Sequence, residues 1–208
     1  MRAAKLKQVL AAELGTGMTA KTGADDLWVF GYGSLIWRPG FAFEESVQAR
    51  LHGYHRSLCI FSHVHRGTPE RPGLVLGLDR GGVCRGLAFR VAAGQAEPTI
   101  AYLREREQAT AVYLERRLPL RLADGRQVTG LAYVADRRHL QYAGRLAPEA
   151  LLALVRQGRG SSGENPDYVL QTHEHLRRMG VYDPVLAALA EQLAPGIGAA
   201  HPPVGKSP

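Results

Sequence analysis

The stretch Trp28–Trp37, WVFGYGSLIW, interrupts what otherwise looks like a buried strand. An apolar run enters it, Gly31–Ser34 breaks it, and a second apolar run follows. Glycines let a backbone approach a neighbour or ligand closely, and consecutive N–H groups in such a turn can bind an anion. The residues therefore predict either a β-bulge or a cradle for a carboxylate or phosphate.

Three well-known glycine motifs do not fit this turn. Position 36 is Ile, so the stretch is not G-x-G-x-x-G, and no Gly-Lys-Ser/Thr of a phosphate loop follows it. Ser34 comes directly after Gly33, with no glycine two residues on, which excludes the G-x-S-x-G of a serine hydrolase. The turn thus lacks the signature of a dinucleotide site, a nucleotide-phosphate site or a nucleophilic serine.

Length and composition are those of one globular domain. The 208 residues are 45% hydrophobic and 22% charged, and no window approaches the ~18 apolar residues of a membrane-spanning helix. We expect an N-terminal helix and linker over 1–26, a domain over 27–194 and a disordered tail over 195–208. The basic N-terminus has no continuous apolar core, so we interpret it as an amphipathic helix and not a signal peptide, and expect a cytoplasmic protein.

The net charge of +7 raises the hypothesis of nucleic-acid binding. The positive charges are spread along the chain as isolated arginines or short pairs, without a run of five or more. An anionic small substrate explains this charge at least as well, so we expect no nucleic-acid partner and no membrane partner.

Strands dominate the first two thirds of the chain and helices follow them, which predicts an α+β protein with a curved or barrel-like sheet. The predicted strands cover 27–30, 73–91 (a hairpin with its turn at Asp79–Gly82) and 126–136. The predicted helices run from Thr99 toward Tyr113, from Pro148, from an Asn165 N-cap to a stop at Gly180, and from Asp183.

Glu107 is the one charged residue on the apolar face of the helix expected after Pro98. At 100° per residue, it shares an arc of about 100° with apolar residues such as Ile100 and Leu103. A carboxyl facing the core must be paired or protonated, and burial raises its pKa toward neutrality. Glu107 is therefore either a member of a structural ion pair or a general base and acid.

Other polar clusters carry weaker signals. Cys59, His63 and His65 have a spacing that a metal could tolerate, but no C-x-x-C or H-E-x-x-H pair supports them, so we expect no metal. The loop GRGSSGENPDY leads into a helix start whose free N–H groups could hold an anion, and Tyr168 there could offer its hydroxyl to a site. The alternative for this loop is a simple connection.

Taken together, these segments resemble the ChaC family of γ-glutamylcyclotransferases. The resemblance rests on an ordered set of motifs from about residue 27 to 183: VFGYGSLIWRPGF, HRG at 65–67, PG at 72–73, YLREREQATAVY, GLAYVAD and GENPDYV. It implies a small mixed β-barrel flanked by helices, and cleavage of glutathione to 5-oxoproline and cysteinylglycine without a metal or organic cofactor.

The resemblance also implies the site. Its catalytic glutamate corresponds to Glu107, and the tyrosine of its late motif to Tyr168. Its substrate loop corresponds to residues Phe30, Gly31, Tyr32, Gly33, Ser34 and Leu35.

The chemistry is a ring closure within the substrate. The α-amine attacks the γ-carbonyl, and positioning does much of the work because the two groups are tethered. We expect Glu107 to move the proton, and the turn amides to hold the α-carboxylate or the oxyanion. Two alternatives stay open: a cyclotransferase for other γ-glutamyl amines or peptides, and a non-catalytic regulator linked to cation transport. The sequence does not fix the oligomeric state, with a monomer slightly favoured.

Overall fold

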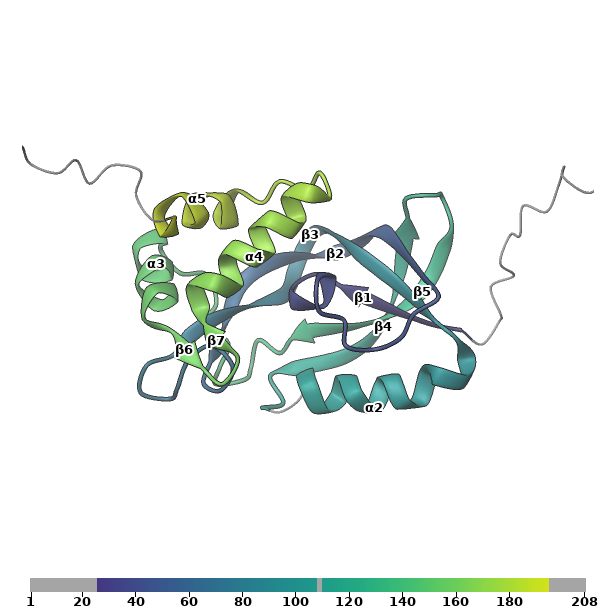
Figure 1. Ribbon diagram of the computed structural model, residues 1–208, viewed down its shortest axis with the longest axis horizontal. Helices are drawn as coiled ribbons and strands as arrows, with labels where there is room; N and C mark the ends of the chain where they lie inside the picture. The colour runs from purple at the N-terminus through teal and green to yellow at the C-terminus, as the bar shows by residue number, and fades with distance from the viewer. Residues whose placement is uncertain (1–25, 108–109, 195–208) are drawn as a thin grey trace, which may run out of the picture.

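The computed structural model describes residues 26–107 and 110–194. The predicted N-terminal helix over 1–14 and the predicted tail over 195–208 lie outside the described residues. Within those ranges, five strands close into a barrel in the order β1-β3-β2-β4-β5, with β1 and β3 each also pairing with β5 in parallel (Figure 1). The strands are β1 Leu27–Gly31, β2 Glu45–Ser62, β3 Gly73–Val91, β4 Tyr113–Leu122 and β5 Gln127–Ala135.

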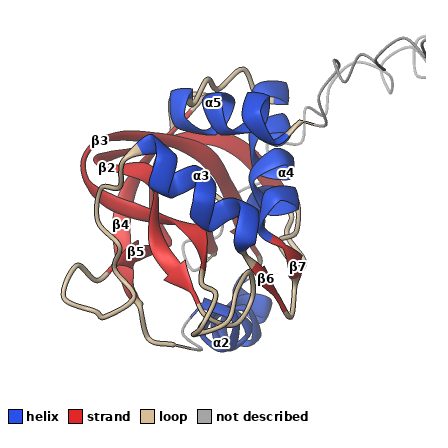
Figure 2. Ribbon diagram, turned by 90° about the vertical axis from the view of Figure 1, so that its left-hand side faces the viewer, coloured by secondary structure: helices blue, strands red, loops and turns tan. Residues whose placement is uncertain are grey.

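Helices surround this barrel unevenly. The helices α3 (Pro148–Gln157), α4 (Asn165–Arg178) and α5 (Pro184–Leu193) gather on one side, whereas α2 (Ala96–Glu107) lies apart from them in both views (Figure 2). Short elements complete the described chain: the 3₁₀ turns η1 (Ser34–Ile36) and η2 (Ala93–Gln95), and the hairpin β6 (Arg159–Gly160) with β7 (Gly163–Glu164). The predicted α+β fold with a small mixed barrel flanked by helices is confirmed.

Strand β1 is buried on both faces. Trp28 and Phe30 belong to the apolar cluster that includes residues of α3, α4 and α5. Leu27 and Val29 point the other way, into a cluster that contains Ile100 and Leu103 of α2. A strand covered on both faces reads as a continuous apolar run, which is why WVF in the sequence shows no alternation.

The predicted hairpin turn at Asp79–Gly82 is wrong. Strand β3 continues through this segment and stays paired with β2, with a register shift near Gly53. Gly53, Gly81 and Gly82 all have positive φ angles, of 84°, 101° and 73°. The glycines therefore form a bulge that bends a long two-stranded ribbon, instead of ending a strand. Local turn chemistry is the same in both cases, so the sequence could not separate them.

The helix predicted from Thr99 toward Tyr113 begins and ends earlier. It spans Ala96–Glu107, and Tyr113 is the first residue of β4. Ala111 has a φ of 56°, a left-handed conformation that no helix continues through. The start of α3 at Pro148 agrees with the prediction, and Asp183 caps α5 by accepting a hydrogen bond from the Leu186 amide at 3.1 Å.

Asn165 docks the helical layer onto the barrel. The prediction that it is an N-cap is wrong, because Glu164 precedes the helix and Asn165 is its first residue. Its side chain is fully buried and reaches β3 instead. Oδ1 accepts from the Leu74 amide at 2.7 Å, and Nδ2 donates to the Leu74 carbonyl at 2.8 Å. One amide side chain thus satisfies both backbone groups of a residue 91 positions away.

We expect Asn165→Ala to lower the free energy of unfolding by about 2–5 kcal/mol, because a buried N–H and a buried C=O lose their partners. Urea unfolding followed by circular dichroism measures the change. Gln157→Ala is the matched control: Gln157 donates one hydrogen bond to the Pro72 carbonyl at a partly buried place, and its loss costs about 1 kcal/mol. Equal losses for the two variants would contradict the docking role of Asn165.

Candidate active site

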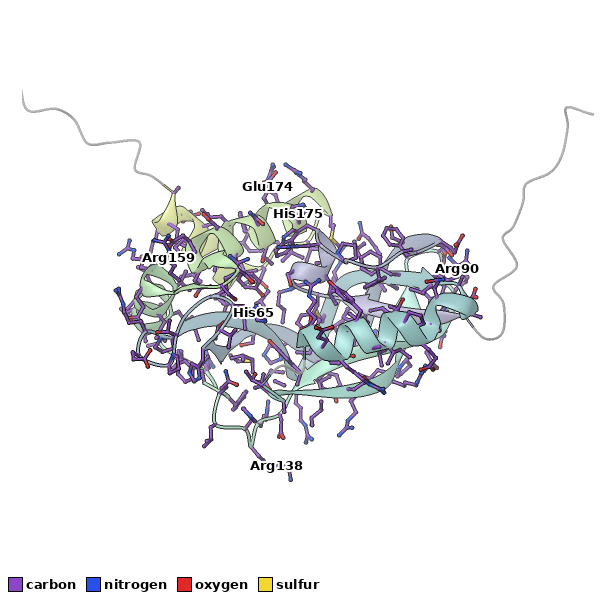
Figure 3. All side chains as sticks on the ribbon, turned by 60° about the horizontal axis from the view of Figure 1, so that its bottom comes forward. His65, Arg90, Arg138, Arg159, Glu174 and His175 are labelled. Atoms are coloured by element: carbon purple, nitrogen blue, oxygen red, sulfur yellow. The ribbon has the colours of Figure 1, made fainter. Side chains whose placement is uncertain are left out.

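A cavity of about 540 Å³ opens at one end of the barrel. Segments that are distant in sequence supply its walls, among them the turn after β1, the end of β2 and the loop that follows it, the start of β3, the end of α2, the start of β4, and the first turns of α4. His65, from the loop after β2, lies between α2 and the α4 side of the molecule (Figure 3).

The glycines of the turn are closely packed. A Cβ added at Gly31 would lie 3.0 Å from Phe89 Cε2 and 3.1 Å from Leu35 Cβ. A Cβ at Gly33 would lie 3.3 Å from the Tyr168 hydroxyl. Glycine is therefore what lets the turn pack against its neighbours, and at Gly33 the backbone faces the cavity.

The backbone amides of this turn divide into two groups. Those of Ile36, Trp37 and Arg38 donate to carbonyls of Gly33 and Ser34 within the turn. The amides of Ser34 and Leu35 come before these donors and take no part in those bonds. Both residues line the cavity, and within 26–107 and 110–194 neither N–H group has a hydrogen-bond acceptor, so both can donate to an anionic or carbonyl oxygen.

Two tyrosine hydroxyls meet at Leu76 in the cavity wall. The Leu76 amide donates to the Tyr168 hydroxyl at 3.1 Å, and the Tyr113 hydroxyl donates to the Leu76 carbonyl at 2.8 Å. Since a hydroxyl both donates and accepts, Tyr168 keeps its own proton for a ligand. Burial raises the pKa of Tyr168 well above its usual range, so the hydroxyl remains a donor at neutral pH.

Tyr32 has a different role from its neighbours in the turn. Its buried hydroxyl donates to the Tyr133 carbonyl at 3.0 Å, and its own carbonyl accepts from Arg56 Nε at 2.6 Å. These bonds fix the chain where it leaves β1. The Tyr32 side chain is therefore anchored to the barrel and contributes to the cavity chiefly as a wall.

Glu107, the last residue of α2, directs its carboxyl to the cavity. It pairs with its neighbour Arg106, whose Nε lies 3.2 Å from Glu107 Oε1, and each of the two side chains is 18% exposed. Burial raises the pKa of Glu107 above its ordinary value, and the Arg106 charge opposes that rise. A carboxyl with a raised pKa is a stronger base than an ordinary one, and it can both accept and return a proton.

Arg106 joins this carboxyl to the turn. Its Nη2 donates to Ser34 Oγ at 2.9 Å, and its Nη1 donates to the Arg38 carbonyl at 2.7 Å and to the Tyr102 hydroxyl at 3.0 Å. The guanidinium is planar with five donors, so it holds several acceptors in fixed directions. Arg106 thereby fixes the distance between Glu107 and the turn.

The structure brings almost all of the predicted site residues together. Glu107 and Tyr168 line the same cavity, as do five residues of the predicted loop: Phe30, Tyr32, Gly33, Ser34 and Leu35. Gly31 lies behind the wall, packed against Phe89.

Sequence reasoning missed Arg106 and Tyr113. Arg106 lies outside the apolar arc predicted for the helix, but its guanidinium donates to Ser34 Oγ in the turn. Tyr113 was expected at the end of a helix, and its position in β4 carries its hydroxyl to Leu76. The repeated Arg-Glu pattern at 104–107 is the one signal in the sequence that could have drawn attention to Arg106.

In the sequence, cysteines and histidines were the possible metal ligands. Across the described ranges, no group of three or more His, Cys, Asp or Glu side chains is arranged to hold a metal ion. Cys59 and Cys84 are buried free thiols, and burial raises the pKa of Cys59 to about 12. None of the helices in the described part of the chain combines the length and hydropathy needed to cross a membrane.

The cavity therefore combines three chemical capacities. Free amides and a tyrosine hydroxyl can hold an oxygen that carries or develops negative charge. A partly buried carboxyl can move a proton beside them. A guanidinium fixes the two parts relative to each other. This combination suits a proton-transfer reaction at a carbonyl group.

Curated proteins of similar sequence cover most of the chain. The "Glutathione-specific gamma-glutamylcyclotransferase" of Escherichia coli (strain K12) is 33% identical over 173 residues, which is 83% of this chain and 75% of that protein. "Glutathione-specific gamma-glutamylcyclotransferase 1" of Homo sapiens is 33% identical over 171 residues, with 79% of this chain and 77% of that protein covered.

A solved structure shares the fold. The crystal structure of a glutathione-specific γ-glutamyl cyclotransferase from yeast matches with a TM-score of 0.75 and 22% identity, over 81% of this chain and 96% of that one. The sequence profile of the family described as "ChaC-like protein" matches residues 27–194. On this family match and the identity to the curated relatives, the chain belongs to the ChaC-like protein family.

Proposed function

We propose that this protein is a γ-glutamylcyclotransferase that degrades glutathione to 5-oxoproline and cysteinylglycine. The observation that carries the proposal is the placement of Glu107, a carboxyl with a raised pKa, in one cavity with the free amides of the Ser34–Leu35 turn. The names of the curated relatives, which specify glutathione, support the choice of substrate.

The reaction makes and breaks one bond each at the γ-carbonyl carbon. The α-amine of the γ-glutamyl group attacks this carbon and closes a five-membered ring, and the bond to the cysteine nitrogen breaks. The ammonium must first lose a proton, and the leaving nitrogen must gain one. Glu107 serves both steps, because a carboxyl that accepts a proton in the first step can return it in the second. Little further machinery is needed, since the reacting groups belong to one molecule.

The turn and Tyr168 position the substrate. The amides of Ser34 and Leu35, together with the Tyr168 hydroxyl, offer donors to either the α-carboxylate or the oxygen that becomes negative as the ring closes. Gly33 leaves room beside the hydroxyl. Phe30 and Leu35 contribute apolar surface to the same cavity, which suits the methylene groups of the γ-glutamyl chain.

This mechanism uses one carboxyl for proton transfer and requires no cofactor. A cytoplasmic location is part of the proposal, because a reducing compartment maintains free thiols such as Cys59 and Cys84. The alternative substrates are other γ-glutamyl amines or peptides, which share the γ-glutamyl end and differ in the leaving group.

The substrate class is tested by incubating the purified protein with glutathione, γ-glutamylcysteine and a γ-glutamyl amino acid, and measuring 5-oxoproline by mass spectrometry. We expect the largest kcat/KM for glutathione. Higher turnover of another compound would reassign the substrate while keeping the chemistry. No product from any of the three would exclude the enzyme and favour a non-catalytic regulator.

We expect Glu107→Gln to reduce kcat by at least about 100-fold with the fold intact, because the side chain keeps its size but loses its basicity. Release of 5-oxoproline and thermal unfolding measure the two effects. Glu105→Gln makes the same chemical change on an exposed residue of the same helix and should leave kcat unchanged. Near-normal turnover in Glu107→Gln would refute the role of Glu107.

The pH dependence follows from the state of Glu107 in the free enzyme. As a base it must be ionised, so kcat/KM should fall as pH drops through its raised pKa, with the midpoint of that limb above 4.5. Arg106→Gln removes the charge that opposes the rise, so the midpoint should move to higher pH. The control Arg104→Gln, on an exposed arginine that pairs with Glu115, should leave it in place. A downward shift in Arg106→Gln would contradict this account.

A further inference from the structure

Glutathione carries two carboxylates, and the turn can account for at most one of them. The other belongs to the glycine residue of the leaving group. From the scissile carbonyl this carboxylate is two residues further along an extended chain, or roughly 7 Å. A side chain that binds this carboxylate would therefore lie in the cavity away from the turn.

Arg66 is a half-buried guanidinium in that part of the cavity. Its Cζ lies 5.4 Å from the ring centroid of Tyr168, the tyrosine whose hydroxyl adjoins Gly33. Tyr168 therefore contacts both parts of the cavity: its hydroxyl adjoins the turn, and the face of its ring carries the Arg66 guanidinium. The position suits the far end of a substrate whose γ-glutamyl group is held at the turn.

The guanidinium of Arg66 has an open edge. Nη1 donates to the Glu164 carbonyl at 2.9 Å. No acceptor among residues 26–107 and 110–194 is hydrogen-bonded to Nε or Nη2, and no carboxyl in those ranges lies within ion-pair distance of Arg66. Asp167 also lines the cavity without forming such a pair. Two parallel N–H donors on one edge are the arrangement that binds a carboxylate through both of its oxygens.

The backbone around Arg66 is held in place. The Arg66 amide donates to Ser62 Oγ at 2.9 Å. The hairpin of β6 and β7 supports the same loop, since the Ser161 and Ser162 amides donate to the carbonyls of Val64 and His65 at 2.8 and 3.0 Å. A cation on a fixed loop loses little entropy when it binds its partner.

The surrounding charges also favour an anion. Arg38 and His65 line the cavity near Arg66. The pKa of His65 is lowered, first by burial and then by the charges of Arg106 and Arg66. The cavity therefore already holds an excess of positive charge that a substrate carboxylate would offset.

We propose that the open edge of Arg66 binds the glycine carboxylate of glutathione and thereby selects glutathione over γ-glutamyl compounds that lack a carboxylate at that distance. This inference rests on the proposed function. It adds a leaving-group subsite to the γ-glutamyl site formed by the turn and Glu107.

The test compares glutathione with its C-terminal glycinamide, which differs only in the charge of that group. We expect the wild-type protein to show a kcat/KM for glutathione about 10- to 100-fold higher than for the amide. Arg66→Gln should remove this preference by lowering kcat/KM for glutathione and leaving that for the amide nearly unchanged. Arg66→Lys keeps the charge but loses the planar fork, so its preference for glutathione over the amide should lie between those of the wild-type protein and Arg66→Gln.

Arg71→Gln is the matched control, because Arg71 is an exposed arginine of the same loop outside the cavity lining. It should leave kcat/KM for both substrates unchanged, and thermal unfolding checks the fold of each variant. Equal use of glutathione and the amide by the wild-type protein would overturn the Arg66 subsite while the proposed function stands. An equal decrease in kcat/KM for glutathione and for the amide in the Arg66 variants would also overturn the Arg66 subsite. No 5-oxoproline from either substrate in the wild-type protein would overturn the proposed function as well.

Discussion

The structure depends on the insertion of β1 between β3 and β5. This five-residue strand pairs antiparallel with β3 and parallel with β5, and so closes the barrel. Because apolar clusters that include residues of the helices cover both of its faces, the strand must be apolar throughout. The chain then leaves it through a turn that packs tightly on Phe89 and Leu35. The glycine turn therefore lies at the end of the barrel, where α2 ends and α4 begins.

The same side chains complete the hydrogen bonds of the fold and form the site. Where the barrel gives way to irregular chain, buried backbone groups need partners, and side chains supply them. Tyr113 and Tyr168 serve Leu76, Asn165 serves Leu74, and Arg106 holds the backbone after Ser34. The hydroxyl of Tyr168 and the guanidinium of Arg106 also face the cavity. These polar side chains therefore have a structural role as well as a place in the cavity.

Sequence patterns correctly predicted structural features that depend on neighbouring residues. They failed for features that depend on pairing with a distant strand. The apolar arc after Pro98 correctly predicted that Glu107 faces inward, because Ile100 and Leu103 lie within two turns before it. The Asp79–Gly82 segment was assigned to a turn, since its continued pairing with β2 is invisible from within it.

Asn165 shows the same limit at a helix start. Its residue type suggested a cap for its own helix, whereas its partner is a strand residue 91 positions earlier. The roles of Arg106 and Arg66 likewise could not be predicted, because each contacts a segment far from it in sequence.

Arg106 couples the electrostatics of the two halves of the cavity. Its guanidinium lowers the pKa of Glu107 and donates at the same time to Ser34. A carboxylate bound at the turn would add a negative potential that partly cancels the effect of this guanidinium on ionised Glu107. The charge of whatever the turn binds would therefore shift the proton affinity of Glu107, so binding at one part of the cavity would tune the base at the other.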